Sequence, residues 1–300
     1  MTEISCPLYI SQKQVDSTGL ILHGFLGNHK SMEELASHLD SAYLLPDLIG
    51  HGLSPCPTEL KHYTFQAMVK QIHDVVSSSL QEPFDLIGYS MGARLALSYA
   101  LAKQGNVRSL ILIGGSPGIQ ENFARHQRAL DDIRKVALLE DKGLTGFVNA
   151  WETQRIFSTQ RLLSSNKLLA QRRARLSTNP LGIKSHLRAS GAGVMQPLWG
   201  RLHEIKIPVL LIVGSEDEKY IDIGKRMQLR IPESKIAIIP GAGHAVHLEE
   251  PEETAEVINE FIREFEYANC EGPLRINPTD NYIKGTNRIK RWLGRGFGRG

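Results

Sequence analysis

Cysteine is scarce in this sequence, which has only three such residues, Cys6, Cys56 and Cys270, among 300. Their number is odd and their spacing is wide, so they match neither a disulfide framework nor a zinc site. Long apolar runs are missing too, since none approaches the roughly 20 residues that span a bilayer. The N-terminus, Met1 to Ser5, lacks the basic flank and the long apolar stretch of a signal peptide. We therefore expect a cytoplasmic protein without a metal site.

Acidic residues are nearly absent from the end of the chain, where positions 273–300 carry seven basic residues and a single acid, Asp280. This segment has a charge of +6, whereas the net charge of the chain is +3, so the other residues together carry −3. Glycine-rich charged segments rarely pack, and we expect a basic, disordered tail over 267–300. A weaker alternative is that Ile289, Trp292 and Leu293 let the tail bind an anionic membrane reversibly.

The apolar residues occur mostly in short continuous runs that end in turn signals. Continuous rather than alternating apolarity is typical of strands that are covered on both faces, as in a parallel sheet. Helical patterns fall between several of these runs, at 65–78, 93–103 and 253–265. The alternation predicts an α/β protein with a doubly wound, mostly parallel sheet. The expected strands lie at 20–22, 43–45, 86–87, 110–113, 209–213 and 236–239.

Strand signals vanish between residues 116 and 201, where the sequence is helical, polar and rich in arginine. The strand pattern resumes at Val209, so this segment is inserted between two strands of one sheet. We expect a helical cap over 116–201 that folds above a site on the core. The core then comprises 1–115 and 202–266.

The stretch Gly88-Tyr89-Ser90-Met91-Gly92 follows an expected strand and opens an expected helix. A strand that turns sharply into a helix exposes the central side chain of the turn, and only small neighbours permit that turn. Ser90 would then present its hydroxyl at the N-terminal end of a helix, where partial positive charge favours a developing anion. The pattern predicts a nucleophile elbow.

A serine hydroxyl is nearly inert at neutral pH and needs an adjacent base that an acid orients. On a sheet of this kind the expected chain order is serine, acid, histidine. Asp217 and His244 each follow an expected strand, in that order. We predict the triad Ser90, Asp217 and His244. Glu216 is a weaker rival for the acid, and His51 is expected to be a structural loop histidine rather than a second base.

Two backbone N–H groups, those of Phe25 and Met91, are candidates for an oxyanion hole. Phe25 lies in the glycine-flanked loop after the first expected strand, and Met91 follows the serine. Arg94 lies one helical turn beyond Ser90 on the same face of the helix. Because arginine pairs bidentately with carboxylates, Arg94 indicates an anionic substrate, with a solvated or internally paired arginine as the alternative.

Taken together, these motifs resemble the 2-succinyl-6-hydroxy-2,4-cyclohexadiene-1-carboxylate synthases, a family of the α/β-hydrolase superfamily that acts in menaquinone and phylloquinone biosynthesis. The resemblance covers about residues 19–265. The triad motifs occur throughout the superfamily and are not specific to this family. The specific signals are Arg94, the Gly-Gly-x-Pro-Gly stretch at 114–118, and the cap pattern Arg125-x-x-Arg128 with Trp151 beyond it.

The resemblance implies a lyase of the α/β-hydrolase fold that needs no cofactor. Such an enzyme removes a proton from 2-succinyl-5-enolpyruvyl-6-hydroxy-3-cyclohexene-1-carboxylate and eliminates pyruvate, with Ser90 as a base relayed through His244 and Asp217. The oxyanion hole would hold the enolate-like oxygen formed from the succinyl carbonyl. By the same resemblance, the side chains that bind or enclose the substrate are Arg94, Arg128, Arg175, Tyr89 and Trp151.

Some assignments leave alternatives. The position of the third arginine, Arg175, depends on a one-residue shift, so Arg172 and Arg173 are alternatives to it. Ile49 stands where the family usually has proline, which bears on the shape of a loop rather than on chemistry. The same triad would serve a serine esterase or a carbon–carbon bond hydrolase, and the fold could also be retained in a ligand receptor. We expect a small anionic substrate and no nucleic-acid partner, and the sequence leaves the oligomeric state open.

Overall fold

The computed structural model describes residues 7–11, 17–270 and 292–294, and these contain an eight-stranded sheet with the order β1-β3-β2-β4-β5-β6-β7-β8. The six inner strands, from β3 to β7 in this order, are parallel, whereas each edge strand pairs antiparallel to its neighbour. The strands are β1 (Ile10–Ser11), β2 (Gly19–Leu22), β3 (Tyr43–Pro46), β4 (Phe84–Tyr89), β5 (Val107–Ile113), β6 (Val209–Gly214), β7 (Ser234–Ile239) and β8 (Trp292–Gly294).

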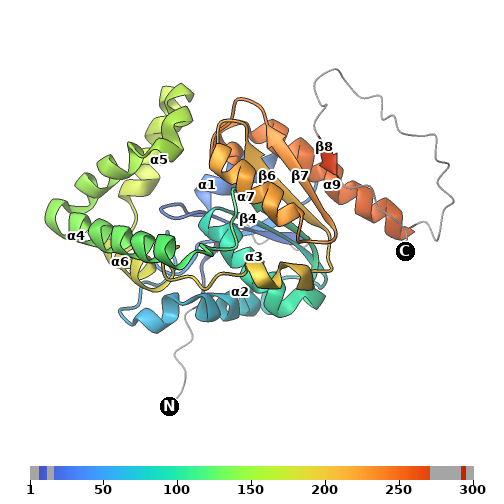
Figure 1. Ribbon diagram of the computed structural model, residues 1–300, viewed down its shortest axis with the longest axis horizontal. Coiled ribbons are helices and arrows are strands. Elements are labelled where there is room, and N and C mark those ends of the chain that lie inside the picture. The colour runs from blue at the N-terminus through green and yellow to red at the C-terminus, as the bar shows by residue number, and fades with distance from the viewer. Residues whose placement is uncertain (1–6, 12–16, 271–291, 295–300) are drawn as a thin grey trace, which may run out of the picture.

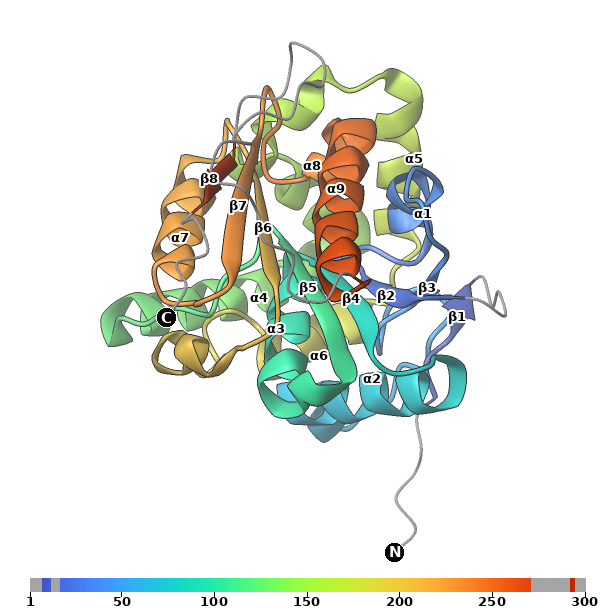
Figure 2. The ribbon, with the colours of Figure 1, turned by 90° about the vertical axis from the view of Figure 1, so that its right-hand side faces the viewer.

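Helices cover both faces of this sheet. They are α1 (Lys30–Ser37), α2 (Phe65–Ser79), α3 (Met91–Lys103), α7 (Glu218–Gln228) and α9 (Pro251–Cys270). Successive strand residues point to opposite faces. Leu110 and Leu112 of β5 therefore join the apolar core formed with α2, α3 and α7, whereas Ile111 and Ile113 join the core formed with α1 and α9. Figure 2 shows α9 in front of the sheet. The prediction of a doubly wound, mostly parallel sheet is confirmed, with all six expected strands present.

Three helices that lie between β5 and β6 in the chain gather to one side of the sheet, at the left of Figure 1. They are α4 (Asn122–Glu152), α5 (Ser165–Leu176) and α6 (Pro180–Ala189). Apolar residues of α4 and α6 form a small core that includes Val136, Phe147 and Ile183 and meets the loop after β2 at Leu26. The three helices lie within the expected cap, and its boundaries at 116 and 201 stay predictions.

The structure differs from the prediction at both edges of the sheet. β1 and β8 escape sequence prediction because they have only two and three residues. The sequence predicts disorder over 267–300, and that prediction is wrong at two places. Residues 267–270 form the end of helix α9, and the backbone of 292–294 pairs with residues 235–237 of β7. An open strand edge with unpaired N–H and C=O groups readily binds a further strand.

The rest of the predicted tail, including the membrane contact through Ile289, lies outside the described residues apart from the last turns of α9. Trp292 and Leu293, which that hypothesis places in a membrane, have their backbone in the sheet. Among the described residues, no helix has the length and apolar character to cross a membrane.

The cap helix α6 touches the core directly at the loop after β3. Gly182 of α6 and Gly50 of the loop approach backbone to backbone, and Gly50 has a φ of 71°. A Cβ atom added at Gly182 would clash with the carbonyl oxygen of Gly50. Only glycine permits an approach this close, so the two glycines fix where the helix sits on the core.

Gly182→Ala should lower the free energy of unfolding by about 1–3 kcal/mol, because the added methyl group forces α6 away from the Gly50 loop. Alanine by itself favours a helix over glycine, so a loss of stability reports the clash. Gly105→Ala is the matched control, since a Cβ atom there meets no heavy atom within 4 Å. Urea unfolding measures both variants, and a Gly182→Ala midpoint equal to that of the wild type would contradict the contact.

Candidate active site

Ser90 occupies a sharp turn between β4 and α3, in the strand–turn–helix arrangement that the sequence predicts. Its backbone has φ 51° and ψ −102°, which residues other than glycine rarely adopt. A Cβ atom at Gly92 would clash with the carbonyl oxygens of Leu22 and His23, and one at Gly88 would clash with the carbonyl of Gly92. Both glycines are therefore required, and the turn holds the serine side chain out from the sheet.

The structure brings Ser90, His244 and Asp217 together in one hydrogen-bonded chain. Oγ of Ser90 lies 3.0 Å from Nε2 of His244, and Nδ1 of His244 lies 2.8 Å from Oδ2 of Asp217. Because an ionised carboxylate only accepts, Nδ1 carries the proton, and Nε2 can accept the hydrogen bond of the serine hydroxyl. The buried imidazole is thus placed to take a proton from Ser90 while the carboxylate stabilises the imidazolium that forms.

Two residues that sequence reasoning missed hold His244 in place. Glu249, at the end of the short helix α8 (Val246–Glu249), accepts hydrogen bonds from the N–H groups of Gly243 at 2.7 Å and Ala245 at 3.3 Å. Its carboxylate therefore fixes the backbone on both sides of the histidine. The ring of Tyr220 packs with its centre 4.4 Å from that of His244. The one available signal was an aromatic residue, Tyr220, three positions after the predicted triad acid, because the bonds of Glu249 to backbone N–H groups leave no pattern in the sequence.

The two rival candidates have other partners. Oε1 of Glu216 accepts a hydrogen bond from the hydroxyl of Ser215 at 3.1 Å, so Glu216 does not orient His244. Nε2 of His51 accepts the backbone N–H of Leu26 at 3.4 Å. His51 therefore holds the backbone of the loop after β2 in place, which is a structural role.

The two residues predicted for the oxyanion hole line the same cavity as Ser90. Met91 is the first residue of α3, so its N–H has no acceptor within the helix. Phe25 lies in the loop after β2, which His23 braces through Nδ1 to the carbonyl of Gly24 at 2.8 Å and through Nε2 to a backbone N–H at 2.9 Å. The structure thus places both residues beside the serine, and their role as donors stays a prediction.

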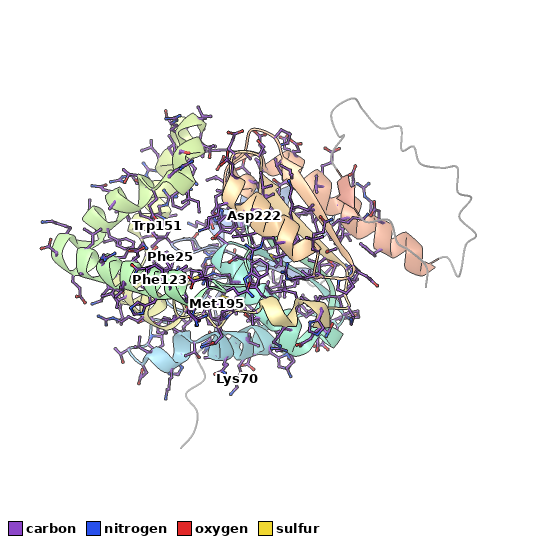
Figure 3. The ribbon with its side chains drawn as sticks, in the orientation of Figure 1. Phe25, Lys70, Phe123, Trp151, Met195 and Asp222 are labelled. Carbon is purple, nitrogen blue, oxygen red and sulfur yellow. The ribbon has the colours of Figure 1, made fainter. Side chains whose placement is uncertain are left out.

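A cavity of about 970 Å³ lies between the cap helices and the loops that follow the central strands, and Ser90 opens into it. Phe25 and Trp151 pack edge to face in its wall, with ring centres 5.1 Å apart, and Figure 3 labels them next to each other on the side of the cap helices. Tyr89 lines it next to the serine. Among the described residues Glu34 is the one carboxylate in the lining, against six cations. The cationic residues are Lys30, Arg94, Arg128, Lys167, Arg173 and Arg175.

Arg94 stands largely buried at the cavity wall, and no carboxylate pairs with it in the described part of the chain. Its Nη1 donates to the carbonyl of Ser190 at 3.2 Å and lies 4.0 Å from Sδ of Met195, and its guanidinium carbon lies 5.7 Å from the centre of the Phe65 ring. Burial lowers the pKa of Arg94 to about 10, so the group is still charged at neutral pH. A desolvated cation without a counter-ion is costly, and a bound carboxylate would relieve that cost.

The other two predicted arginines line the cavity but already have carboxylate partners. Nε of Arg128 donates to Asp132 at 2.9 Å. Nη1 of Arg175 donates to Glu152 at 3.0 Å and Nη2 to Gln160 at 3.2 Å. Burial lowers the pKa of Arg175, and its contact with Glu152 acts in the opposite direction.

The alternatives to Arg175 differ in where they lie. Arg173 lines the cavity and is exposed to solvent, whereas Arg172 pairs with Glu152 and with Asn149 outside the lining. Glu152 at the end of α4 thus pairs with two arginines of α5, Arg172 and Arg175. Arg94 differs from these arginines because it has no carboxylate partner in the described residues.

Three further histidines, His29, His186 and His247, line the cavity and were not identified from the sequence. The ring centre of His247 lies 4.0 Å from that of Tyr89, and its buried Nδ1 has no hydrogen-bond partner in the described residues. Within the described ranges, no three His, Cys, Asp or Glu side chains cluster in a way that could hold a metal ion.

The free energy of unfolding should fall as the pH drops below about 6.5. Burial lowers the pKa of His23 to about 4 and the pKa values of His51 and His247 to about 3. Burial also lowers the pKa of His186 well below 6.5. The unfolded chain then binds more protons in this range, so the stability is complete above about pH 6.5 and is lost toward about pH 4.

Each of these histidines contributes at most about 1.4 kcal/mol per pH unit to that loss. Urea unfolding at about pH 7.5 and about pH 5 measures the effect. Equal stability at the two pH values would show that the four rings do not stay neutral in the folded protein.

Comparison with known proteins places the chain among enzymes of this architecture. The family described as the alpha/beta hydrolase fold matches residues 20–251. A Bacillus subtilis (strain 168) protein provisionally named 2-succinyl-6-hydroxy-2,4-cyclohexadiene-1-carboxylate synthase is 35% identical over 242 residues, which cover 80% of this chain and 88% of that protein. The synthase of that name from Enterobacter sp. (strain 638) is 26% identical over 81% of this chain and 91% of its own length.

A solved structure agrees with these relatives. The structure of MenH from S. aureus superposes with a TM-score of 0.82 at 32% sequence identity, and the match covers 89% of this chain and 100% of that one. The fold, the shared length and the level of identity all point to the same group of proteins. The chain belongs to the α/β-hydrolase superfamily and, within it, to the family of 2-succinyl-6-hydroxy-2,4-cyclohexadiene-1-carboxylate synthases.

Proposed function

We propose that this protein is a lyase that eliminates pyruvate from 2-succinyl-5-enolpyruvyl-6-hydroxy-3-cyclohexene-1-carboxylate to give 2-succinyl-6-hydroxy-2,4-cyclohexadiene-1-carboxylate. The observation that carries the proposal is the charge of Arg94, which lies four residues after Ser90 at the wall of a cationic cavity and pairs with no carboxylate of the described chain. A substrate with several carboxylates supplies the missing counter-ion beside the reacting group. Membership of the synthase family supports the same assignment.

The names of substrate and product define the bonds that change. The C2–H bond of the ring breaks, and its electron pair forms the C2=C3 double bond. The pair of the C3=C4 double bond moves to C4=C5, and the C5–O bond breaks toward the enolpyruvyl oxygen. The leaving enol takes up a proton at carbon and becomes pyruvate. Neither water nor an external oxidant is consumed, so no acyl-enzyme is required.

Ser90 acts as the base for the C2 proton in this proposal. Its own hydroxyl proton passes to Nε2 of His244 at 3.0 Å as the serine oxygen receives the substrate proton. Asp217, at 2.8 Å from Nδ1, stabilises the imidazolium. The carbanion at C2 delocalises onto the succinyl carbonyl oxygen, and the N–H groups of Phe25 and Met91 hold the enolate-like oxygen that results.

The three arginines differ in how freely they can bind a substrate carboxylate, because two of them already pair with a carboxylate of the protein. Arg94 takes a substrate carboxylate most directly, because the group it now bonds is a neutral carbonyl. Arg128 and Arg175 attract the substrate through the field of the cavity and through the guanidinium nitrogens that do not face Asp132 or Glu152. The rings of Tyr89 and Trp151 enclose the cyclohexene ring.

We also propose a cytoplasmic location for the protein. Reversible contact of the C-terminal tail with a membrane is a separate hypothesis.

A serine esterase or a carbon–carbon bond hydrolase is the alternative, because the same triad geometry would serve an acyl-enzyme. Supplying the enolpyruvyl precursor from the enzyme that makes it, and following the release of pyruvate, distinguishes the two. We expect pyruvate release from wild-type protein, and we expect Ser90→Ala to lose several orders of magnitude in kcat with little change in substrate binding. Rapid hydrolysis of simple esters with no pyruvate from the precursor would overturn the lyase assignment.

Arg94→Ala and Arg128→Ala should each lower kcat/KM by at least about tenfold, since a hydrogen bond to a charged group contributes about 1.5–3 kcal/mol. Arg134→Ala is the matched control, because that arginine lies on the same cap helix as Arg128 but is 70% exposed and outside the cavity lining. Steady-state pyruvate release measures all three variants. If the two cavity variants matched the control, the assignment of these arginines to the substrate would be wrong.

A further inference from the structure

The C-terminal end of α6 lies against the Arg94 side chain. Nη1 of Arg94 donates to the carbonyl of Ser190, which is the C-cap residue directly after this helix. The carbonyl groups at a helix C-terminus carry partial negative charge and favour a nearby cation. The helix end therefore balances the guanidinium in part while leaving it without a carboxylate. A substrate carboxylate then meets a charge that no acidic side chain of the described residues has neutralised.

His186, in the last turn of α6, connects this helix end to the core. Its Nε2 lies 2.7 Å from the carbonyl oxygen of Ile49, and its Nδ1 lies 2.8 Å from Oγ of Ser190. A carbonyl oxygen only accepts, so Nε2 carries the proton and Nδ1 accepts from the serine hydroxyl. His186 and Ser190 are each 1% exposed, so no solvent replaces either bond.

The core side of this contact is closely packed. Ile49 directly precedes Gly50, whose backbone touches Gly182 one helical turn before His186. The imidazole packs against the rings of His51 and Tyr63, with centres 4.6 Å and 5.1 Å away. Burial and the neighbouring His51 keep the pKa of His186 well below 6.5, so the ring bridges its two partners in the neutral form at pH 7.

We propose that His186 is a positioning residue for Arg94: its imidazole ties the Ser190 end of α6 to the Ile49 carbonyl and so fixes the carbonyl on which the guanidinium rests. This inference rests on the proposed function, because it takes Arg94 as a group that binds a substrate carboxylate. It assigns a role in substrate binding to a cap histidine that does not itself belong to the triad.

The kinetic test uses three variants of the full chain with the enolpyruvyl precursor. His186→Leu should raise KM about tenfold with a much smaller change in kcat, because Arg94 loses its fixed orientation while the triad is untouched. His186→Gln should return KM close to the wild-type value, since its amide nitrogen stands in for Nε2 at the Ile49 carbonyl. Ser190→Ala keeps the carbonyl but removes the hydroxyl, and should raise KM by a smaller factor.

The matched control is Ile183→Val, which removes one buried methylene from the same helix and does not line the cavity. It should lower stability and leave KM unchanged. In an Arg94→Ala background, His186→Leu should have no further effect on KM, because the group that it positions is gone. A KM unchanged in both His186→Leu and Ser190→Ala, or an equal rise in KM with and without Arg94, would overturn the proposal.

A crystal structure of His186→Leu, or of Ser190→Ala if the first variant does not fold, tests the positioning without any substrate. We expect the Arg94 guanidinium to leave the Ser190 carbonyl or to occupy several orientations. A guanidinium still within hydrogen-bond distance of that carbonyl overturns the inference. If the wild-type protein releases no pyruvate, the proposed function fails, and this structural comparison still decides whether His186 positions Arg94.

Discussion

The close approach of three backbone segments at the Ser90 turn is the constraint on which the site depends. β4 ends and α3 begins where the end of β2 passes over Gly92, so neither glycine of the turn can carry a side chain. Because α3 starts at this turn, one geometry places the Ser90 hydroxyl, the Met91 N–H and, one helical turn later, the Arg94 guanidinium. β4 lies inside a parallel sheet, whose carboxyl edge also carries the loops of the triad acid and histidine.

The cap completes this site by electrostatics as well as by enclosure. Arg128 and Arg175, which come from the cap and line the cavity, have acidic partners within the cap. Arg94 comes from the core and instead meets the carbonyl at the end of α6. A helix end lowers the cost of burying a cation without cancelling its charge, which suits the proposed binding of a substrate carboxylate by Arg94. In the proposed mode of binding, core and cap therefore both contribute cationic groups to the substrate site.

Sequence patterns were sufficient where the structure depends on neighbours in the chain. The inner strands are visible in the sequence as continuous apolar runs, and the Ser90 elbow is visible as glycines at a fixed spacing around the serine. The sequence could not reveal contacts that only the fold creates. His186 meets Ile49 across 137 residues, and Glu249 acts through backbone N–H groups that carry no sequence signal. β8 was missed because three residues are too few for a strand pattern, and its pairing depends on the open edge of β7.

In the proposed reaction Ser90 removes a ring proton and does not attack a carbonyl carbon. Single-turnover kinetics with excess enzyme test this most directly, using precursor that carries deuterium at C2 of the ring. We expect pyruvate to appear several-fold more slowly than from unlabelled precursor, and we expect intact-protein mass spectrometry to find no covalent adduct. Equal rates for the two precursors, together with an acyl adduct on Ser90, would contradict it.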